Sequence, residues 1–416
     1  MGNTERFNSL PHIPGGVASV ASYAKVCPKG DHARVVPGER VFEAAELPEL
    51  RKLIADQAEH DNQELDRLLA QLRVAKGNVR TIKPRSATSI ALMAADGGNN
   101  RVTFNPFYLQ VVRIVDSAGK QLCLDVVSPS TDIDELSRQQ FVRGANSKIK
   151  PLGRLMEALS VSGLKDLSHM MSGKSASWVL VYRELCEWAT LFDLICNRDF
   201  AQDTLVVYDG LLRCKKFRGD LFIQMYRKLC ERIDHVWRTE RRRLWLVGLA
   251  KSSQVLENYR LAMSLSGLFE RGSPCFVPVP YEMQKHVYRW DEYIRSPDDV
   301  DEDREDPKYN IGAMHFVRFG PRSGDPVWTV DLLESQKSDA QTVFGYLLAD
   351  AIAGFPVPFY PNCLQQADRY SRVADLDLDI VEDALVDAVR QQVGSERAPI
   401  IDELRLATDV AARRYE

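Results

Sequence analysis

The first clear hydrophobic pattern in the chain predicts a long amphipathic helix. From Leu47 to about Val74, apolar residues recur at intervals of three and four, which is the spacing of such a helix. The middle of this helix is polar, which favours a helix that projects from the body of the protein. Residues 1–45 are punctuated by Pro and Gly and predict an extended arm. We therefore predict that residues 1–80 form an N-terminal arm and a long helix.

Short apolar runs further along the chain predict strands that alternate with helices. Apolar or β-branched runs predict strand segments at Ser89–Ala95, Val102–Val115, Gln121–Val127, Thr204–Tyr208, Leu244–Leu249, His315–Phe319 and Val327–Val330. Helical spacing predicts helices at Leu152–Leu167, Trp178–Cys196, Asp220–Arg243 and over most of the chain after Gln336. Because the first strands form a meander and later strands alternate with helices, we predict an α/β sheet with an antiparallel hairpin at its start.

Composition narrows the class of protein. The chain has 416 residues, of which 45% are hydrophobic and 27% are charged, so it can form the cores of two or three globular units. Collagen-like, coiled-coil and low-complexity classes are excluded. The eight cysteines include no C-x-x-C pair, which argues against zinc-ribbon and thioredoxin-like sites and favours reduced thiols in the cytosol. No run of about 18 apolar residues occurs, so we expect a cytoplasmic protein without a membrane span.

Two aspartates are the first candidates for chemistry, because each stands where an apolar run stops. Asp96 is followed by Gly97, and Asp209 is followed by Gly210. Open sheets bind ligands at strand ends, and a neighbouring Gly lets a phosphate approach the backbone closely. Carboxylates on neighbouring strands can share hard divalent cations, which support two-metal hydrolysis of phosphodiesters. The alternative is that each Asp-Gly pair forms a turn after a strand.

A third carboxylate comes from the predicted helix Trp178–Cys196. Glu184 and Glu187 are three residues apart and share a helix face. Either glutamate can be a partly buried metal ligand or an exposed neighbour of Arg183, and the pattern does not choose between the two.

Basic residues near these acids predict contacts with phosphates. Lys251 follows the predicted strand Leu244–Leu249 and can point at a phosphate from the same end of the sheet. A basic cluster follows Asp209, and a nucleic-acid backbone requires such a patch. Its members are Arg213, Lys215, Lys216 and Arg218. The alternative is that these charges lie on solvated surfaces without a ligand.

The order of these motifs carries a family resemblance. The pieces are the strand into Asp96-Gly97, the hairpin after it, Arg183-Glu184-Leu185-x-Glu187-Trp188, Tyr208-Asp209-Gly210-Leu211-Leu212, Gly248-Leu249-Ala250-Lys251 and Phe359-Tyr360-Pro361-x-x-Leu364-x-x-Ala367. Together they resemble the NurA nuclease family over residues 85–375. The resemblance implies an RNase H-like mixed sheet core with flanking helices, and a Mn²⁺- or Mg²⁺-dependent DNA nuclease. It also implies a homodimer that docks on a hexameric HerA-type translocase in end resection, repair or phage defence.

The resemblance also assigns site residues and domain boundaries. It implies that Asp96, Asp209 and Glu184 bind the metal, with Glu187 as the alternative glutamate, and that Lys251 is the basic residue. The family has a histidine where this chain has Asp368, and an aspartate oxygen can still bind a hard cation. The predicted catalytic domain spans residues 85–375, includes a solvated acidic loop at 296–307, and is followed by a helical tail at 376–416.

Three functions are consistent with the sequence. In the first, the carboxylates hold metal ions that activate water, while Lys251 and the basic cluster position the DNA backbone. In the second, Asp368 marks a degenerate site and the protein is a DNA clamp or adaptor of a translocase complex. In the third and weakest, the protein binds a small phosphorylated ligand and no nucleic acid.

Overall fold

The computed structural model divides the chain into two units, with the boundary between Asp61 and Asn62. The described residues are 47–86, 90–104, 107–142, 149–172, 177–270, 272–288, 293–295, 297, 308–371, 375–393 and 399–400. The predicted N-terminal arm, nearly all of the acidic loop and the end of the C-terminal tail lie outside these residues. Within the described ranges, no helix has the length and apolar character needed to span a membrane.

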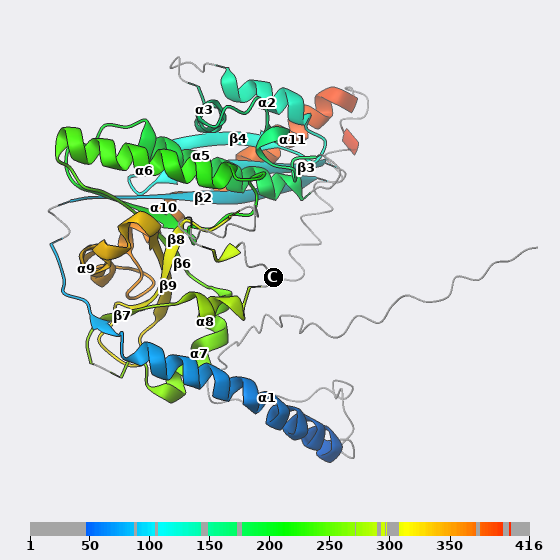
Figure 1. The fold of residues 1–416 in the computed structure, drawn as a ribbon. Coiled ribbons are helices and arrows are strands. Elements are labelled where there is room, and N and C mark those ends of the chain that lie inside the picture. Colours follow the sequence, from blue (N-terminus) through cyan, green and yellow to red (C-terminus); the bar gives the residue numbers. More distant parts are fainter. Residues whose placement is uncertain are drawn as a thin grey trace, which may run out of the picture. The chain divides into compact units, whose positions relative to one another are not determined.

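A nine-stranded mixed sheet forms the centre of the second unit (Figure 1). Its strands are β1 (Arg80–Thr81), β2 (Ala91–Phe104), β3 (Phe107–Asp116), β4 (Gln121–Val127), β5 (Thr204–Asp209), β6 (Leu244–Ala250), β7 (Cys275–Pro278), β8 (Gly312–Arg318) and β9 (Val327–Leu333). The strand order is β1-β7-β8-β9-β6-β5-β2-β3-β4. The β2–β5 and β5–β6 pairs are parallel, and the other pairs are antiparallel. The order β4-β3-β2-β5-β6 is that of an RNase H-like core, and the prediction of a mixed α/β sheet is confirmed.

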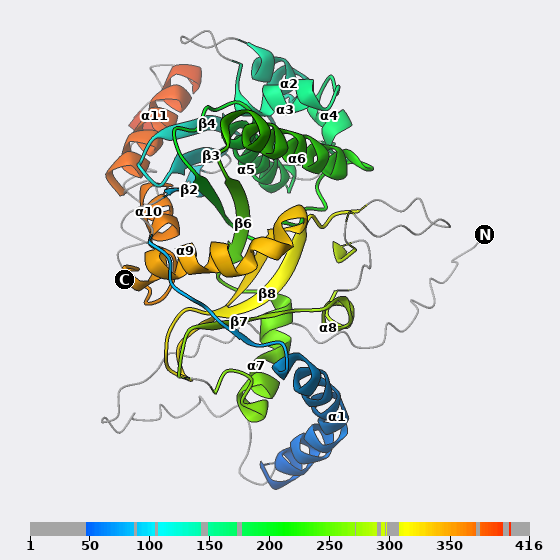
Figure 2. The ribbon, with the colours of Figure 1, turned by 60° about the vertical axis from the view of Figure 1, so that its left-hand side comes forward.

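Helices flank the sheet, as predicted. They are α1 (Leu47–Lys76), α2 (Ile133–Phe141), α3 (Pro151–Ala158), α4 (Leu164–Leu167), α5 (Trp178–Cys196), α6 (Leu221–Glu240), α7 (Gln254–Ser266), α8 (Tyr281–Lys285), the 3-10 helix η3 (Glu334–Asp339), α9 (Ala340–Ile352), α10 (Asn362–Ser371) and α11 (Asp375–Val393). One core packs α3, α5 and α6 against the sheet, and another packs α9 and α10 against β5, β6 and β9 (Figure 2). Strands β5 and β6 are almost wholly buried because helices cover both of their faces.

The predicted end of the first strand is wrong. We predicted that it stops at Ala95 and that Asp96-Gly97 begins a turn, but β2 runs through Asp96 to Phe104. The pairs Gly97↔Ile114 and Gly98↔Arg113 join this segment to β3. Cross-strand pairing thus overrides the local turn preference of the glycines. Only the parallel pairing with β5 stops at Ala95, so Asp96 still lies beside the carboxyl end of β5.

One predicted helix is interrupted, while others are confirmed. The predicted helix Leu152–Leu167 is two helices, α3 and α4, because Ser160 adopts a left-handed conformation with φ of 56°. Helix α5 has the predicted bounds, Trp178–Cys196. The long N-terminal helix is confirmed as α1.

Candidate metal centre

Three carboxylates from three separate elements converge beside the end of β5. Asp96 comes from β2, Asp209 is the last residue of β5, and Asp368 lies on α10. Each offers an oxygen, and these oxygens lie within 4.8 Å of one another. Helix α10 lies alongside β2 (Figure 2). Its buried face, which includes Leu364 and Ala367, packs into the core. An all-oxygen donor set suits Mg²⁺ or Mn²⁺.

Lys251 lies among these carboxylates. Its Nζ atom is 2.9 Å from Asp209 Oδ2 and 3.4 Å from Asp368 Oδ1. Burial lowers the pKa of Lys251, but the charges of Asp209, Asp368 and Asp96 outweigh this effect and raise it above its ordinary value. The ammonium therefore stays protonated and offsets part of the repulsion among the acids. This is the end of β6 at which we predicted a phosphate-facing lysine.

Two hydroxyls that we did not predict contact the aspartates. The Tyr360 hydroxyl donates to Asp209 Oδ1 at 3.1 Å, and the Ser371 hydroxyl donates to Asp96 Oδ2 at 2.7 Å. Tyr360 belongs to a motif used for the family resemblance, but the sequence contains no local signal that either side chain faces a carboxylate.

The two helix glutamates lie in different surroundings. Glu187 lines a cavity of about 200 Å³ together with Asp96 and Asp209, and its side chain is 14% exposed. Arg183 Nε lies 3.2 Å from Glu187 Oε1. Glu184 does not line this cavity. It accepts a hydrogen bond from Cys214 Sγ at 3.2 Å and lies in a neighbouring groove. Of the two glutamates, Glu187 is therefore the one that lies beside Asp96 and Asp209.

Burial and like charges disfavour ionisation in this cluster. Burial, together with Asp96, Glu184 and Asp209, raises the pKa of Glu187 to about 8, although Arg183 opposes the shift. The pKa of Asp96 is also raised, first by burial and then by Asp209 and Asp368. A divalent cation would relieve this repulsion, because it favours the charged form of each carboxylate.

Metal affinity is therefore expected to depend on pH through Glu187. A carboxylate with a raised pKa holds its proton at neutral pH, and the metal must displace that proton. Mn²⁺ affinity should rise as the pH increases from about 6 to about 8. Titration calorimetry at several pH values measures this slope. A Glu187→Gln variant should show a flatter slope, and an unchanged slope would contradict the assignment.

Gly97 makes room for the Glu187 carboxylate. A Cβ atom at Gly97 would lie 2.3 Å from Glu187 Oε1, which is too close for any real contact. We expect Gly97→Ala to displace this carboxylate and weaken Mn²⁺ affinity about tenfold. Calorimetry and thermal melting should separate this effect from unfolding. Gly324→Ala is the matched control, because nothing lies within 4 Å of the Cβ it would add. Equal affinities in both variants would contradict the close approach.

The prediction that Arg213 contacts DNA is corrected. Its side chain is fully buried and forms an ion pair with Asp331, with Nε 2.9 Å from Oδ2 and Nη2 3.0 Å from Oδ1. Its Nη1 atom donates to Gln284 Oε1 at 2.6 Å. The guanidinium therefore cannot reach a phosphate at the surface. It ties the loop after β5 to β9 instead.

The other basic residues of the cluster remain accessible. Lys215 and Lys216 line a groove of about 760 Å³ that also contains Glu184 and Tyr293. Lys215 Nζ lies 4.6 Å from the centre of the Tyr293 ring. Lys216 Nζ lies 3.9 Å from Glu184 Oε2, and Arg218 is exposed.

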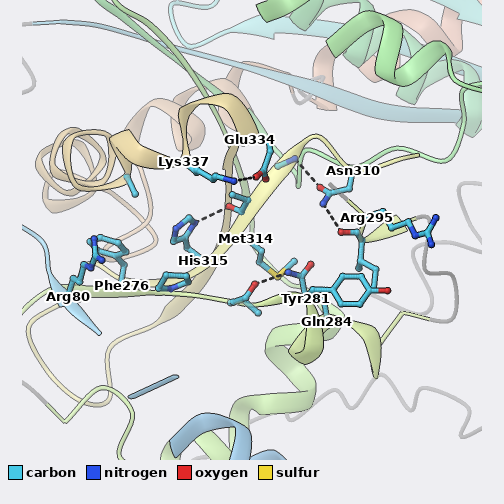
Figure 3. Close-up of a pocket in the computed structure, with 16 residues that line it drawn as sticks. Arg80, Phe276, Tyr281, Gln284, Arg295, Asn310, Met314, His315, Glu334 and Lys337 are labelled. Atoms are coloured by element: carbon cyan, nitrogen blue, oxygen red, sulfur yellow. Dashed lines mark hydrogen bonds and ion pairs between the residues drawn. The ribbon is translucent and has the colours of Figure 1, made fainter. Parts of the chain in front are cut away.

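A larger cavity of about 810 Å³ lies away from the carboxylates. Residues from β7, β8, α8 and η3 surround it, including His315, Gln284 and Lys337 (Figure 3). It shares no lining residue with the cavity that contains Glu187. Burial lowers the pKa of His315 to about 4, so its imidazole is neutral at physiological pH.

The fold and the site define a mixed α/β protein whose sheet carries a carboxylate cluster suited to a divalent cation. No family model and no curated protein matches the sequence. Among solved structures, the chain is similar to the NurA nuclease from Sulfolobus solfataricus, with 14% identity and a TM-score of 0.36 over 84% of this chain and 97% of that chain. It is also similar to NurA bound to dAMP and manganese, with 11% identity and a TM-score of 0.38 over 84% and 98% of the two chains.

Proposed function

We propose that the chain is a metal-dependent DNA nuclease that hydrolyses phosphodiester bonds with Mn²⁺ or Mg²⁺. The observation that carries the proposal is the convergence of Asp96, Asp209 and Asp368, with oxygens within 4.8 Å of one another. These oxygens are the donors that hard cations prefer. The cluster lies beside the carboxyl end of β5, and open α/β sheets bind ligands at such ends.

Four acidic residues would bind the metal together. Asp96, Asp209 and Asp368 would bind it from one side, and Glu187 would complete the site from α5. A bound divalent cation activates water and offsets charge on the leaving oxygen. The surrounding carboxylates would also keep substrate phosphates away unless a cation is present, because like charges repel at short range.

Basic side chains would position the DNA. Lys251 lies beside Asp209 with its side chain 48% exposed, so its ammonium can reach a phosphate oxygen near the scissile bond. Lys215, Lys216 and Arg218 would contact the backbone further along the strand. Arg213 is left out of this set because it is buried.

Asp368 supports the nuclease over a degenerate clamp or adaptor. The family resemblance gives a histidine at this position, and its replacement motivated the clamp alternative. However, Asp368 lies within the cluster and offers an oxygen donor, so it would still supply a ligand to a bound cation. We expect it to favour hard cations over softer ones such as Zn²⁺.

We further propose that the protein acts as a homodimer with a hexameric HerA-type ATPase in DNA end processing, repair or phage defence. The resemblance in sequence motifs supports this proposal. Sedimentation of the purified protein tests the dimer, and co-purification with the cognate translocase tests the partner. A monomer that does not bind the translocase would contradict both parts.

Cleavage of linear and circular DNA in Mn²⁺, Mg²⁺ or EDTA tests the proposed activity. We expect metal-dependent degradation, and we expect Glu187→Gln to slow it about a hundredfold because a metal ligand is lost. Glu184→Gln is the matched control on the same helix and should retain most activity. If the protein alone cuts nothing, the assay is repeated with the translocase and ATP. A second failure would favour the clamp, and equal losses in both variants would contradict the choice of Glu187.

A further inference from the structure

Helix α10, which carries Asp368, and the residues just before it also contribute two buried hydroxyl groups. These hydroxyls, of Tyr360 and Ser371, contact Asp209 and Asp96. We propose that Tyr360 and Ser371 are positioning residues that orient Asp209 and Asp96 for metal binding. This inference rests on the proposed function. It adds two residues that contact no reacting atom and would act through the carboxylates alone.

Tyr360 holds one carboxylate oxygen of Asp209. Its side chain is 1% exposed, and its hydroxyl donates to Asp209 Oδ1 at 3.1 Å. The ring packs edge-on against Trp328, with centroids 4.8 Å apart, and Trp328 Nε1 donates to the carbonyl of Phe359 at 2.7 Å. These contacts fix the hydroxyl in place. Lys251 Nζ bonds the other oxygen, Asp209 Oδ2, at 2.9 Å, so both oxygens of Asp209 are held.

Ser371 holds one carboxylate oxygen of Asp96 by a hydrogen bond. It is 1% exposed, and its hydroxyl lies 2.7 Å from Asp96 Oδ2 and 3.0 Å from the carbonyl oxygen of Asp368. The hydroxyl has a single proton, which it can give to either acceptor. The shorter contact is to the carboxylate, and a charged acceptor forms the stronger bond.

Both hydroxyls lie on or just before helix α10, which also carries Asp368. Asp368 and Ser371 are three residues apart on α10 and therefore share a face. Tyr360 precedes the helix by two residues. Packing of this one helix thus supplies one ligand and orients two others. Groups that hydrogen-bond metal ligands limit the directions the ligands can adopt, and removing such groups weakens metal binding.

The test uses Tyr360→Phe and Ser371→Ala in the full chain. Tyr360→Phe keeps the ring that packs on Trp328 and removes only the hydroxyl. We expect each variant to bind Mn²⁺ about tenfold more weakly than wild type in calorimetry without DNA. The melting temperature of the metal-free protein should change little, and added Mn²⁺ should raise it less than in wild type.

Tyr346→Phe is the control for the loss of a buried tyrosine hydroxyl. Tyr346→Phe removes a hydroxyl from a buried tyrosine of α9 that packs on Trp245, and it should leave Mn²⁺ affinity unchanged. Wild-type affinity in both Tyr360→Phe and Ser371→Ala would overturn the positioning roles while leaving the proposed nuclease intact. Lower melting temperatures without any loss of Mn²⁺ affinity would show roles in stability alone and would also overturn the inference. No Mn²⁺ binding by wild type would overturn the metal centre itself, and the positioning roles with it.

Discussion

Asp209→Asn is expected to reduce metal-dependent DNA cleavage by about a thousandfold or more. Asp209 is the central residue of the cluster: its oxygens contact Lys251 and Tyr360, and it lies near both Asp96 and Asp368. An amide has nearly the same shape as a carboxylate but carries no charge to hold a divalent cation. Initial rates on linear DNA in Mn²⁺ measure the effect.

The fold should survive this substitution. Asn can still accept the hydrogen bond from Tyr360, and removing one of several close negative charges lowers their mutual repulsion. We therefore expect a melting temperature equal to or above that of the wild type without metal. Cleavage within tenfold of the wild type would remove Asp209 from the site. If the melting temperature of the variant falls by a large amount, its loss of cleavage would reflect unfolding and not the loss of a metal ligand.

Asp331→Ala is expected to destabilise the protein by about 3 to 5 kcal/mol, because it leaves the buried charge of Arg213 without its partner. Both side chains are 0% exposed. Asp331 Oδ2 also accepts a hydrogen bond from the backbone N–H of Leu212 at 3.1 Å. The loop that follows Asp209 would lose two of its attachments. Chemical denaturation followed by circular dichroism gives the free energy of unfolding.

An exposed ion pair provides the matched control for this measurement. Asp387 pairs with Arg390 at 2.7 Å, and its side chain is 62% exposed. Asp387→Ala should change the free energy of unfolding by less than about 1 kcal/mol, because solvent screens such pairs. Similar values for Asp331→Ala and Asp387→Ala would contradict the inference that the Arg213 pair stabilises the loop beside the metal centre.

Much of the acidic cluster could be predicted from local sequence. Asp209 ends a run of buried residues, and that run is apolar because helices cover both faces of β5. Asp96 was found in the same way, although its strand continues beyond it. Glu184 and Glu187 were both recognised as candidates, since helical spacing places them on one face of the helix. Each of these signals depends on residues that are near one another in the chain.

Two of the wrong predictions concern contacts between distant residues. The glycines after Asp96 favour a turn by themselves, but pairing with β3 extends the strand. Arg213 belongs to a basic run and was predicted to bind DNA, but Asp331 is 118 positions further along the chain and draws it into the interior. No residue near Arg213 in the sequence indicates that Asp331 is its partner. A charge that is typical of a surface can be buried when a distant residue neutralises it.

Local hydrophobic patterning was therefore enough to predict an α/β protein, its main strands and helices, and carboxylates where apolar runs stop, because these features depend on periodicity over a few residues. Only the tertiary structure decided which carboxylates meet. It placed Glu187, and not Glu184, in the cavity with Asp96 and Asp209, where the Glu187 carboxylate lies against Gly97. It also brought Ser371 to Asp96 from 275 residues away. Such contacts arise from the packing of whole elements, and this packing depends on the complete core and on no single segment of the chain.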